Sequence, residues 1–169
     1  IVIRTREENV FNDMSLFDDV AIINAGHSTS QHPTQALLDA ATILHNKGTL
    51  DNLKIAICGD IAHSRVARSN IYGLITMGAK VTVCGPPNLI PCNIRELGAD
   101  ITYNIEELMD WADALNILRI QKERMGLPLI PSVREYRSSF GLTTERLKHH
   151  KKKIIIMHPG PMNRGVEID

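Results

Sequence analysis

Short apolar runs alternate along the chain with longer segments in which an apolar residue recurs every three or four positions. The short runs end at glycine, proline or polar residues, as buried strands do, whereas the longer period is typical of amphipathic helices. The pattern predicts strands at 1–3, 20–24, 53–58, 80–84, 101–103, 114–118 and 154–157. It predicts helices at 33–47, 64–78, 90–97, 104–111 and 144–150. The segment from Arg119 through Pro128 and Pro131 to Gly141 is predicted to be a polar loop.

Strands that alternate with helices are typical of βαβ units and a parallel sheet. The right-handed crossovers of such units place helices on both faces, so the sequence predicts an α/β, doubly wound fold. Ligands of these folds bind outside the carboxyl ends of the strands. The residues predicted at those ends are Arg4, Gly59-Asp60, Gly85, Arg119 and 158–161.

Arginines stand out among these strand-end residues. Arg4 and Arg119 follow strands directly, and Arg65 lies on an adjoining loop or helix start. One such arginine alone is best interpreted as a solvated surface residue. A set of guanidinium groups at one edge of a sheet instead favours a ligand that carries carboxylates or phosphate.

The segment 31–39 is predicted to open a helix. Pro33 suits the first helical position, and Gly48 suits the residue after the last turn. His32 and Gln35 are three residues apart and project from the same side of the first turn. Together with the unpaired N–H groups of the helix start, they can bind an anion or a polarised carbonyl. The alternative is that His32 only caps the helix. The apolar residues predicted to share one face of this helix are Leu37, Ala40, Ala41 and Leu44.

Composition narrows the class of protein. The chain has 169 residues, of which 43% are hydrophobic and 22% are charged, and its formal net charge is zero. These values are typical of a globular protein and give no support to nucleic-acid or membrane binding. Cys58, Cys84 and Cys92 lack metal-site spacing and are interpreted as reduced thiols of a cytoplasmic protein, and no metal or cofactor is expected. The basic run 148–153 is interpreted as a solvated helix end.

The chain resembles the catalytic chains of the aspartate carbamoyltransferase family. The residues that carry the resemblance are 24–26 with 31–35, 59–60 with 63–70, 118–124, and 158–161 with 163–165. They occur in the family's order and span nearly the whole sequence. Where the family usually has Gly-Asp-Gly, this chain has Gly26-His27-Ser28 in a loop that borders the site. His27 is interpreted as a surface histidine of that loop.

The resemblance implies a division into domains. Residues 1–35 would be the C-terminal part of a carbamoyl-phosphate-binding domain of parallel α/β type, 32–47 an interdomain helix, and 50–169 a Rossmann-like aspartate-binding domain. The family's phosphate loop and mobile lysine would precede residue 1, and its terminal helix would follow Asp169. The fragment alone is therefore expected to be inactive. The full-length protein is expected to be a cytoplasmic homotrimer, with or without regulatory or other pyrimidine-pathway chains.

The resemblance also implies roles for the residues that bind carbamoyl phosphate. In the family reaction the amine of L-aspartate attacks the carbonyl carbon of carbamoyl phosphate, and phosphate leaves. His32 and Arg4 match the residues that donate hydrogen bonds to the carbonyl oxygen, and Arg4 also reaches the phosphate. Gln35 matches the residue that fixes the carbamoyl NH2 group.

A second group of residues matches the aspartate side of the family's site. Arg65 and Arg119 correspond to the arginines that bind the two aspartate carboxylates, and Gln121 supports that end. Pro159 and Gly160 would offer backbone carbonyls to the amino groups. The chemistry requires no nucleophile, metal or organic cofactor, because positioning and electrostatic stabilisation suffice.

Three other functions remain open from the sequence. An ornithine-type carbamoyltransferase would need an acidic partner for a cationic side chain, and Arg119 with Gln121 argues against it. In an NAD-binding Rossmann domain Gly59 would open the phosphate-binding turn, but the segment 59–64 lacks the second and third glycines of that motif. The third alternative is a non-catalytic binding or assembly module with the same fold.

Overall fold

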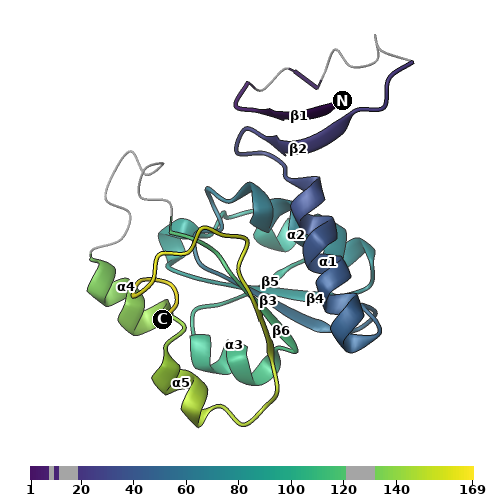
Figure 1. The fold of residues 1–169 in the computed structure, drawn as a ribbon. Helices are drawn as coiled ribbons and strands as arrows, with labels where there is room; N and C mark the ends of the chain where they lie inside the picture. Colours follow the sequence, from purple (N-terminus) through teal and green to yellow (C-terminus); the bar gives the residue numbers. More distant parts are fainter. Residues whose placement is uncertain (8–9, 12–18, 121–131) are drawn as a thin grey trace.

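The computed structural model describes residues 1–7, 10–11, 19–120 and 132–169. Figure 1 shows a large α/β body and a small N-terminal sheet, joined by a helix. The strands are β1 (Val2–Thr5), β2 (Ile23–His27), β3 (Lys54–Cys58), β4 (Lys80–Cys84), β5 (Asp100–Thr102), β6 (Ala114–Ile117) and β7 (Ile155–Met157). The α-helices are α1 (Pro33–Lys47), α2 (Arg65–Thr76), α3 (Ile105–Trp111), α4 (Val133–Phe140) and α5 (Thr144–His149). The 3-10 helices are η2 (Pro87–Leu89) and η3 (Ile94–Leu97).

The larger sheet confirms the predicted doubly wound parallel architecture. Its strands lie in the order β5-β4-β3-β6-β7, and every neighbouring pair is parallel. The chain runs outward from β3 through β4 to β5, then returns to the other side of β3 as β6 and continues to β7. The strand order therefore reverses between β3 and β6, and such switch points open a crevice at the carboxyl ends of the strands.

Alternate residues of the central strand β3 enter different hydrophobic cores. Ile55 and Ile57 belong to the core that includes residues of α1 and α2, whereas Ala56 and Cys58 belong to the core that includes residues of α3. This alternation follows from the two-residue period of side chains along a strand. Both faces of the larger sheet are thus covered by helices, as a parallel sheet requires.

Helix α1 begins and ends at the predicted residues but buries a different face. His32 is its N-cap, and Gly48 ends it in the left-handed region at φ 78°, where its N–H donates to the Leu44 carbonyl at 2.8 Å. The predicted apolar face holds only at Ala40, because Leu37 is 65% exposed and Leu44 is 47% exposed. The residues of α1 that are buried are Ala36, Asp39, Ala40 and Ile43.

The second strand also differs from its prediction, which was a buried strand at 20–24. The parallel register joins Val2 to Ile23 and Thr5 to His27, so β2 starts and ends three residues later than predicted. A strand exists only where a neighbour supplies ladder hydrogen bonds, and β1 supplies them to 23–27. Nor is the strand fully buried, since Ile23 is 49% exposed.

The predicted loop before Gly141 contains a helix. Ser132 caps α4 by accepting a hydrogen bond from the Glu135 N–H at 3.0 Å, and Tyr136 packs with Phe140 in a small core. The spacing of Ser132 and Glu135 is a helix-start signal that the prolines of this segment outweighed in the prediction. The helix predicted at 90–97 is also wrong in type, because only 94–97 is helical there and it is a 3-10 helix.

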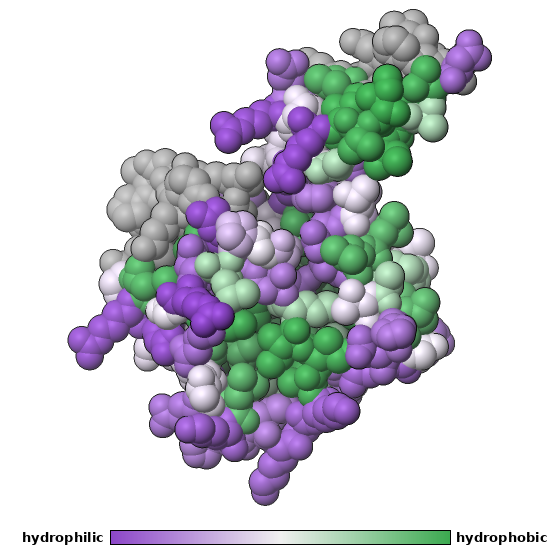
Figure 2. All heavy atoms as spheres, viewed as in Figure 1, coloured by the Kyte–Doolittle hydropathy of each residue, from purple (hydrophilic) through white to green (hydrophobic). Residues whose placement is uncertain are grey.

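Apolar side chains are exposed on the small N-terminal sheet and the adjoining segment. Figure 2 shows them gathered on this part of the molecule, and the residues concerned are Ile1, Val2, Val20 and Ile23. Contiguous exposed apolar surface is typical of a face that packs against another part of a protein or against a partner.

Other sequence predictions concern cysteines and membrane spans. Cys58 and Cys84 are buried free thiols, whereas Cys92 is free and exposed. None of the helices in the described ranges is long and apolar enough to cross a bilayer.

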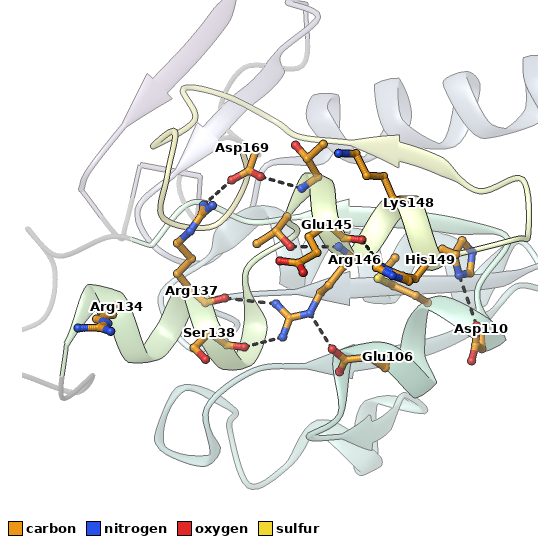
Figure 3. A pocket seen from close by; sticks show the side chains of 14 residues that line it. Glu106, Asp110, Arg134, Arg137, Ser138, Glu145, Arg146, Lys148, His149 and Asp169 are labelled. Atoms are coloured by element: carbon orange, nitrogen blue, oxygen red, sulfur yellow. Dashed lines mark hydrogen bonds and ion pairs between the residues drawn. The ribbon is translucent and has the colours of Figure 1, made fainter.

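Arg146 joins α3, α4 and α5 on one side of the body (Figure 3). Its Nε donates to the Glu106 carboxylate at 2.7 Å, and its Nη atoms donate to the carbonyls of Arg137, Ser138 and Gly141. These carbonyls lie at the C-terminal end of α4, where helices leave acceptors unpaired. Burial alone raises the pKa of Glu106, but the hydrogen bond and the positive charge of Arg146, together with a hydrogen bond from the backbone of Glu106 itself, outweigh burial and hold this pKa below its usual value.

Replacing Arg146 by glutamine should therefore loosen the packing of α3, α4 and α5. We expect Arg146→Gln to lower the free energy of unfolding by about 2 kcal/mol, since hydrogen bonds to a charged group contribute roughly 1.5–3 kcal/mol. Urea unfolding measures the change. The control is Lys148→Gln on the exposed side of α5, which should stay within about 0.5 kcal/mol of the parent chain. Equal destabilisation by both substitutions would contradict the role given to Arg146.

Candidate active site at the strand-order switch point

A cavity of about 410 Å³ lies where β3 and β6 end. Its lining comes from the start of α1, the start of α2, the segment after β6, the segment after β7, and β1 of the small sheet. The lining residues are Arg4, His32, Gln35, Ser64, Arg65, Val66, Leu118, Arg119, Pro159, Gly160 and Pro161.

The cavity brings together the candidate residues that the sequence placed far apart. Those found in its lining are Arg4, His32, Gln35, Arg65, Arg119, Pro159 and Gly160. Gln121 lies outside the described residues. His27 is not among the lining residues; its ring Nε2 lies 3.0 Å from the Glu7 carbonyl oxygen and the ring stacks edgewise on Phe11.

Gly59 lies at the end of β3, next to Leu118 of the cavity lining. It follows β3 with φ +133°, and a Cβ at this position would lie 2.8 Å from the Leu118 carbonyl oxygen. The absence of a side chain thus lets the end of β6 lie close against the end of β3. Gly59 is therefore required by strand packing, which accounts for this glycine without a dinucleotide phosphate.

His32 caps helix α1 and also lines the cavity. Its Nδ1 accepts the Gln35 N–H at 3.3 Å and caps α1, and its own N–H donates to the Ser69 hydroxyl at 2.8 Å. Burial lowers the pKa of His32, and the positive charges of Arg65 and Arg4 lower it further. The ring is therefore neutral near pH 7, and because Nδ1 accepts, Nε2 carries the proton and can donate in the cavity.

The segment Gly26-His27-Ser28 was expected to be a loop, but Gly26 and His27 form the end of β2, and the segment holds the Arg65 side chain. The Arg65 Nη1 donates to the Ser28 carbonyl at 3.2 Å, and a Cβ on Gly26 would lie 3.0 Å from the Arg65 Cζ. Gly26 has φ +127°, a conformation that side chains rarely permit. Sequence reasoning noted this segment only as a departure from a family pattern and missed its contact with the guanidinium group.

His158 holds the segment that contributes Pro159 and Gly160 to the cavity. The Gly160 N–H donates to His158 Nδ1 at 2.9 Å, and His158 Nε2 lies 3.4 Å from a carboxylate oxygen of the buried Glu167. Burial alone raises the pKa of Glu167, but the His158 ring and the Asn163 N–H outweigh burial and hold this pKa below its usual value. No local pattern in the sequence pointed to this contact, because Glu167 is nine residues away.

The charge of the cavity favours anions. Arg4, Arg65 and Arg119 bring positive charge to the described lining, and that lining includes no carboxylate. Guanidinium groups bind carboxylate and phosphate through paired hydrogen bonds, so the site suits a ligand with several anionic groups. A metal cation would be repelled, and within the described ranges no group of His, Cys, Asp and Glu side chains could hold one.

A larger cavity of about 1110 Å³ lies beside α3, α4 and α5 and shares no lining residue with the first. Figure 3 shows side chains of both signs around it, including Arg137 paired with Asp169. Its charges are largely paired within the protein, and it does not lie at the switch point. The basic run 148–153 contributes Lys148 to the lining of this larger cavity. For these reasons we take the smaller cavity as the better candidate for a reaction site.

Two family models match the chain. The model of the aspartate/ornithine carbamoyltransferase Asp/Orn binding domain matches residues 51–169, and that of the carbamoyl-P binding domain matches residues 1–45. The chain belongs to the aspartate/ornithine carbamoyltransferase family. The cavity is lined by residues from both matched segments of the chain, since Arg4, His32 and Gln35 lie in the first and Arg65 and Arg119 in the second.

Individual relatives agree with the family assignment. The aspartate carbamoyltransferase catalytic subunit of Carboxydothermus hydrogenoformans is 51% identical over 170 residues, which cover 100% of this chain and 54% of the relative. The catalytic subunit of M. jannaschii aspartate transcarbamoylase is 35% identical with a TM-score of 0.81, over 100% of this chain and 56% of that one. The chain thus spans about half the length of the relatives it matches.

A third relative carries ligands. It is aspartate transcarbamoylase from Trypanosoma cruzi in complex with carbamoyl phosphate and aspartate, 28% identical with a TM-score of 0.80, over 99% of this chain and 57% of that one.

The protonation of His32 provides a test of the cavity's electrostatics. Because burial and neighbouring positive charge disfavour the imidazolium, we expect the His32 ring to titrate below its usual value of 6.5 in an NMR pH titration. Arg65→Gln should raise the midpoint by removing one of those charges, whereas Arg95→Gln at the exposed η3 should leave it unchanged. The folded chain binds fewer protons at this group than the unfolded chain, so its contribution to stability is present above pH 6.5 and is lost as the pH falls through the lowered pKa. A midpoint at or above 6.5 would contradict this description.

Proposed function

We propose that the protein to which this chain belongs transfers the carbamoyl group of carbamoyl phosphate to the amine of L-aspartate, giving N-carbamoyl-L-aspartate and phosphate. The observation that carries the proposal is the convergence of Arg4, Arg65 and Arg119 with His32 and Gln35 in one cavity. It is supported by the family membership, by relatives named aspartate carbamoyltransferase, and by the T. cruzi relative in complex with carbamoyl phosphate and aspartate.

The carbamoyl half of the reaction fits the residues at the start of α1. Attack on the carbonyl carbon places negative charge on the carbonyl oxygen, and donors aimed at that oxygen stabilise the transition state more than the substrate. We assign this role to the neutral His32 through Nε2 and to the Arg4 guanidinium, which also binds phosphate. Gln35 binds the carbamoyl NH2 group.

The aspartate half fits the lining residues at the start of α2 and in the segments after β6 and β7. We assign Arg65 and Arg119 to the two aspartate carboxylates. Each guanidinium group can form two parallel hydrogen bonds to one carboxylate, so two arginines match the two carboxylates of aspartate. The carbonyls of Pro159 and Gly160 accept from the amino groups, and Gln121 keeps the supporting role that the family resemblance gives it. An ornithine side chain is cationic, and the described lining offers it arginines in place of a carboxylate.

The remaining features of the proposal concern the whole protein. We propose a cytoplasmic homotrimer in pyrimidine biosynthesis, with or without regulatory chains. Within it, residues 1–35 form part of the carbamoyl-phosphate domain, 32–47 the interdomain helix, and 50–169 the aspartate domain. Light scattering of the full-length protein tests the trimer.

The activity is tested with the full-length protein, carbamoyl phosphate, and either L-aspartate or L-ornithine as acceptor. The proposal expects carbamoyl-aspartate to form far above the uncatalysed rate and ornithine to be a poor acceptor. Preference for ornithine, or the absence of carbamoyl transfer to either amine, would overturn it. Binding of a phosphonate–aspartate bisubstrate analogue in a thermal-shift assay, set against NAD, separates the enzyme from a dinucleotide-binding module.

Loss of the Arg119 side chain should weaken the binding of aspartate and leave the binding of carbamoyl phosphate nearly unchanged. A charge-assisted paired contact contributes roughly 1.5–3 kcal/mol, so Arg119→Ala should raise the KM for aspartate about ten- to hundred-fold. The KM for carbamoyl phosphate should stay close to that of the parent enzyme, and Arg95→Ala at η3 should change neither. Steady-state kinetics with each substrate varied in turn measure both constants, and equal damage to the two would mean that Arg119 is structural.

A substitution of Gly26 should weaken aspartate binding by displacing the Arg65 side chain. In Gly26→Ala the new methyl group meets the Arg65 guanidinium, so we expect the KM for aspartate to rise about ten-fold. The matched control is Gly48→Ala, because Gly48 also has positive φ, but a Cβ there would meet no heavy atom of the described residues within 4 Å. Both variants should lose thermal stability from backbone strain, but only Gly26→Ala should change the KM. A normal KM in Gly26→Ala would show that Arg65 does not depend on the end of β2.

A further inference from the structure

Asp39 is a buried carboxylate beside the cavity to which the reaction assigns no role. It is 5% exposed and lies on α1, one turn after Gln35. Its Oδ1 accepts from Gln35 Nε2 at 2.9 Å, and its Oδ2 accepts from Asn70 Nδ2 at 2.7 Å and from Asn116 Nδ2 at 2.8 Å. The donors come from α1, α2 and β6, and the two asparagines reach Asp39 only through the fold.

The chemistry of this cluster determines which way the Gln35 amide points. A carboxylate accepts hydrogen bonds and donates none, so each amide that contacts Asp39 must present its nitrogen to it. With Nε2 of Gln35 directed at Asp39, its Oε1 is the end left for the cavity that Gln35 lines. The NH2 of a carbamoyl group has donors only and therefore requires an acceptor such as this oxygen.

We propose that Asp39 is a positioning residue that fixes the Gln35 carboxamide with its oxygen toward the substrate NH2 group. This inference rests on the proposed carbamoyl transfer. Asn70 and Asn116 hold the other carboxylate oxygen, so Asp39 cannot turn away from Gln35 without losing both contacts. An isolated Gln35 could present either end of its amide; paired with Asp39 it presents one.

The first test is Asp39→Asn in the full-length enzyme. Asparagine has nearly the same shape, but its NH2 group is a donor, which opposes either the Gln35 amide or both asparagine amides directed at this position. We expect kcat/KM for carbamoyl phosphate to fall about ten- to hundred-fold, the range that misplacement of a substrate-binding group produces. The KM for aspartate should change little, because Arg65 and Arg119 are untouched.

The control is Asn70→Ala, which removes a different donor from the same carboxylate and leaves the Gln35 contact in place. Like Asp39→Asn, it should lower the melting temperature, but with little change in the KM for carbamoyl phosphate. A merely structural Asp39 would instead give the two variants the same kinetic defect.

A double-mutant cycle shows whether the effect passes through Gln35. In a Gln35→Ala background, Asp39→Asn should cause little further loss of kcat/KM, because the group it positions is already gone. Full additivity of the two losses, or normal carbamoyl phosphate kinetics in Asp39→Asn alone, would overturn the proposal.

A readout that needs no activity separates this inference from the proposed function. In full-length protein with 15N-labelled glutamine side chains, the Gln35 amide is assigned by its loss in Gln35→Ala. Its protons should exchange slowly with water in the parent protein and faster in Asp39→Asn. If the parent transfers no carbamoyl group, the proposed function fails, yet slow exchange that depends on Asp39 still supports the orientation of Gln35. Exchange that is unaffected by Asp39→Asn overturns it.

Discussion

The pairing of β3 with β4 on one side and β6 on the other is the constraint on which the candidate site depends. Because the chain leaves β3 in one direction and later returns to its opposite edge, the connections diverge at the carboxyl ends and leave room between them. Gly59 lets β6 end close against this point. Arg65 after β3 and Arg119 after β6 then face one cavity, although they are far apart in the sequence.

Gathering arginines in one cavity has an energetic cost that the surrounding structure offsets. Like charges repel, and here the repulsion is visible in the lowered pKa of His32, to which Arg65 and Arg4 both contribute after burial. The Ser28 carbonyl gives Arg65 a hydrogen-bond partner within the protein. Bound carboxylate and phosphate groups would neutralise the remaining charge, so the arrangement that disfavours the empty site favours an anionic ligand.

Local sequence signals predicted most of the fold. The errors arise where residues distant in the sequence determine the bounds of an element or the face that it buries. The caps of α1 follow from Pro33 and Gly48 alone, and the rule that parallel sheets bind ligands at strand ends located the arginines. The bounds of β2 could not be predicted, because they depend on its register with β1. The buried face of α1 was wrong for the same reason: Leu37 is more apolar than Asp39, but Asp39 meets buried amide donors from other elements.

His32 and His158 show why residue type alone does not assign a role. In both, Nδ1 accepts a backbone N–H, at the start of α1 in one case and from Gly160 in the other, which leaves Nε2 as the ring nitrogen that can donate. For His158 that nitrogen faces the buried carboxylate of Glu167, and the side chain is 4% exposed. His32 lines a cavity whose described lining includes arginines and no carboxylate, so no acidic group of that lining faces its Nε2. The same local hydrogen bond therefore fixes the segment 158–160 in the case of His158 and prepares a donor for a ligand oxygen in the case of His32. The two roles differ because a carboxylate faces Nε2 of His158, whereas His32 lies among arginines.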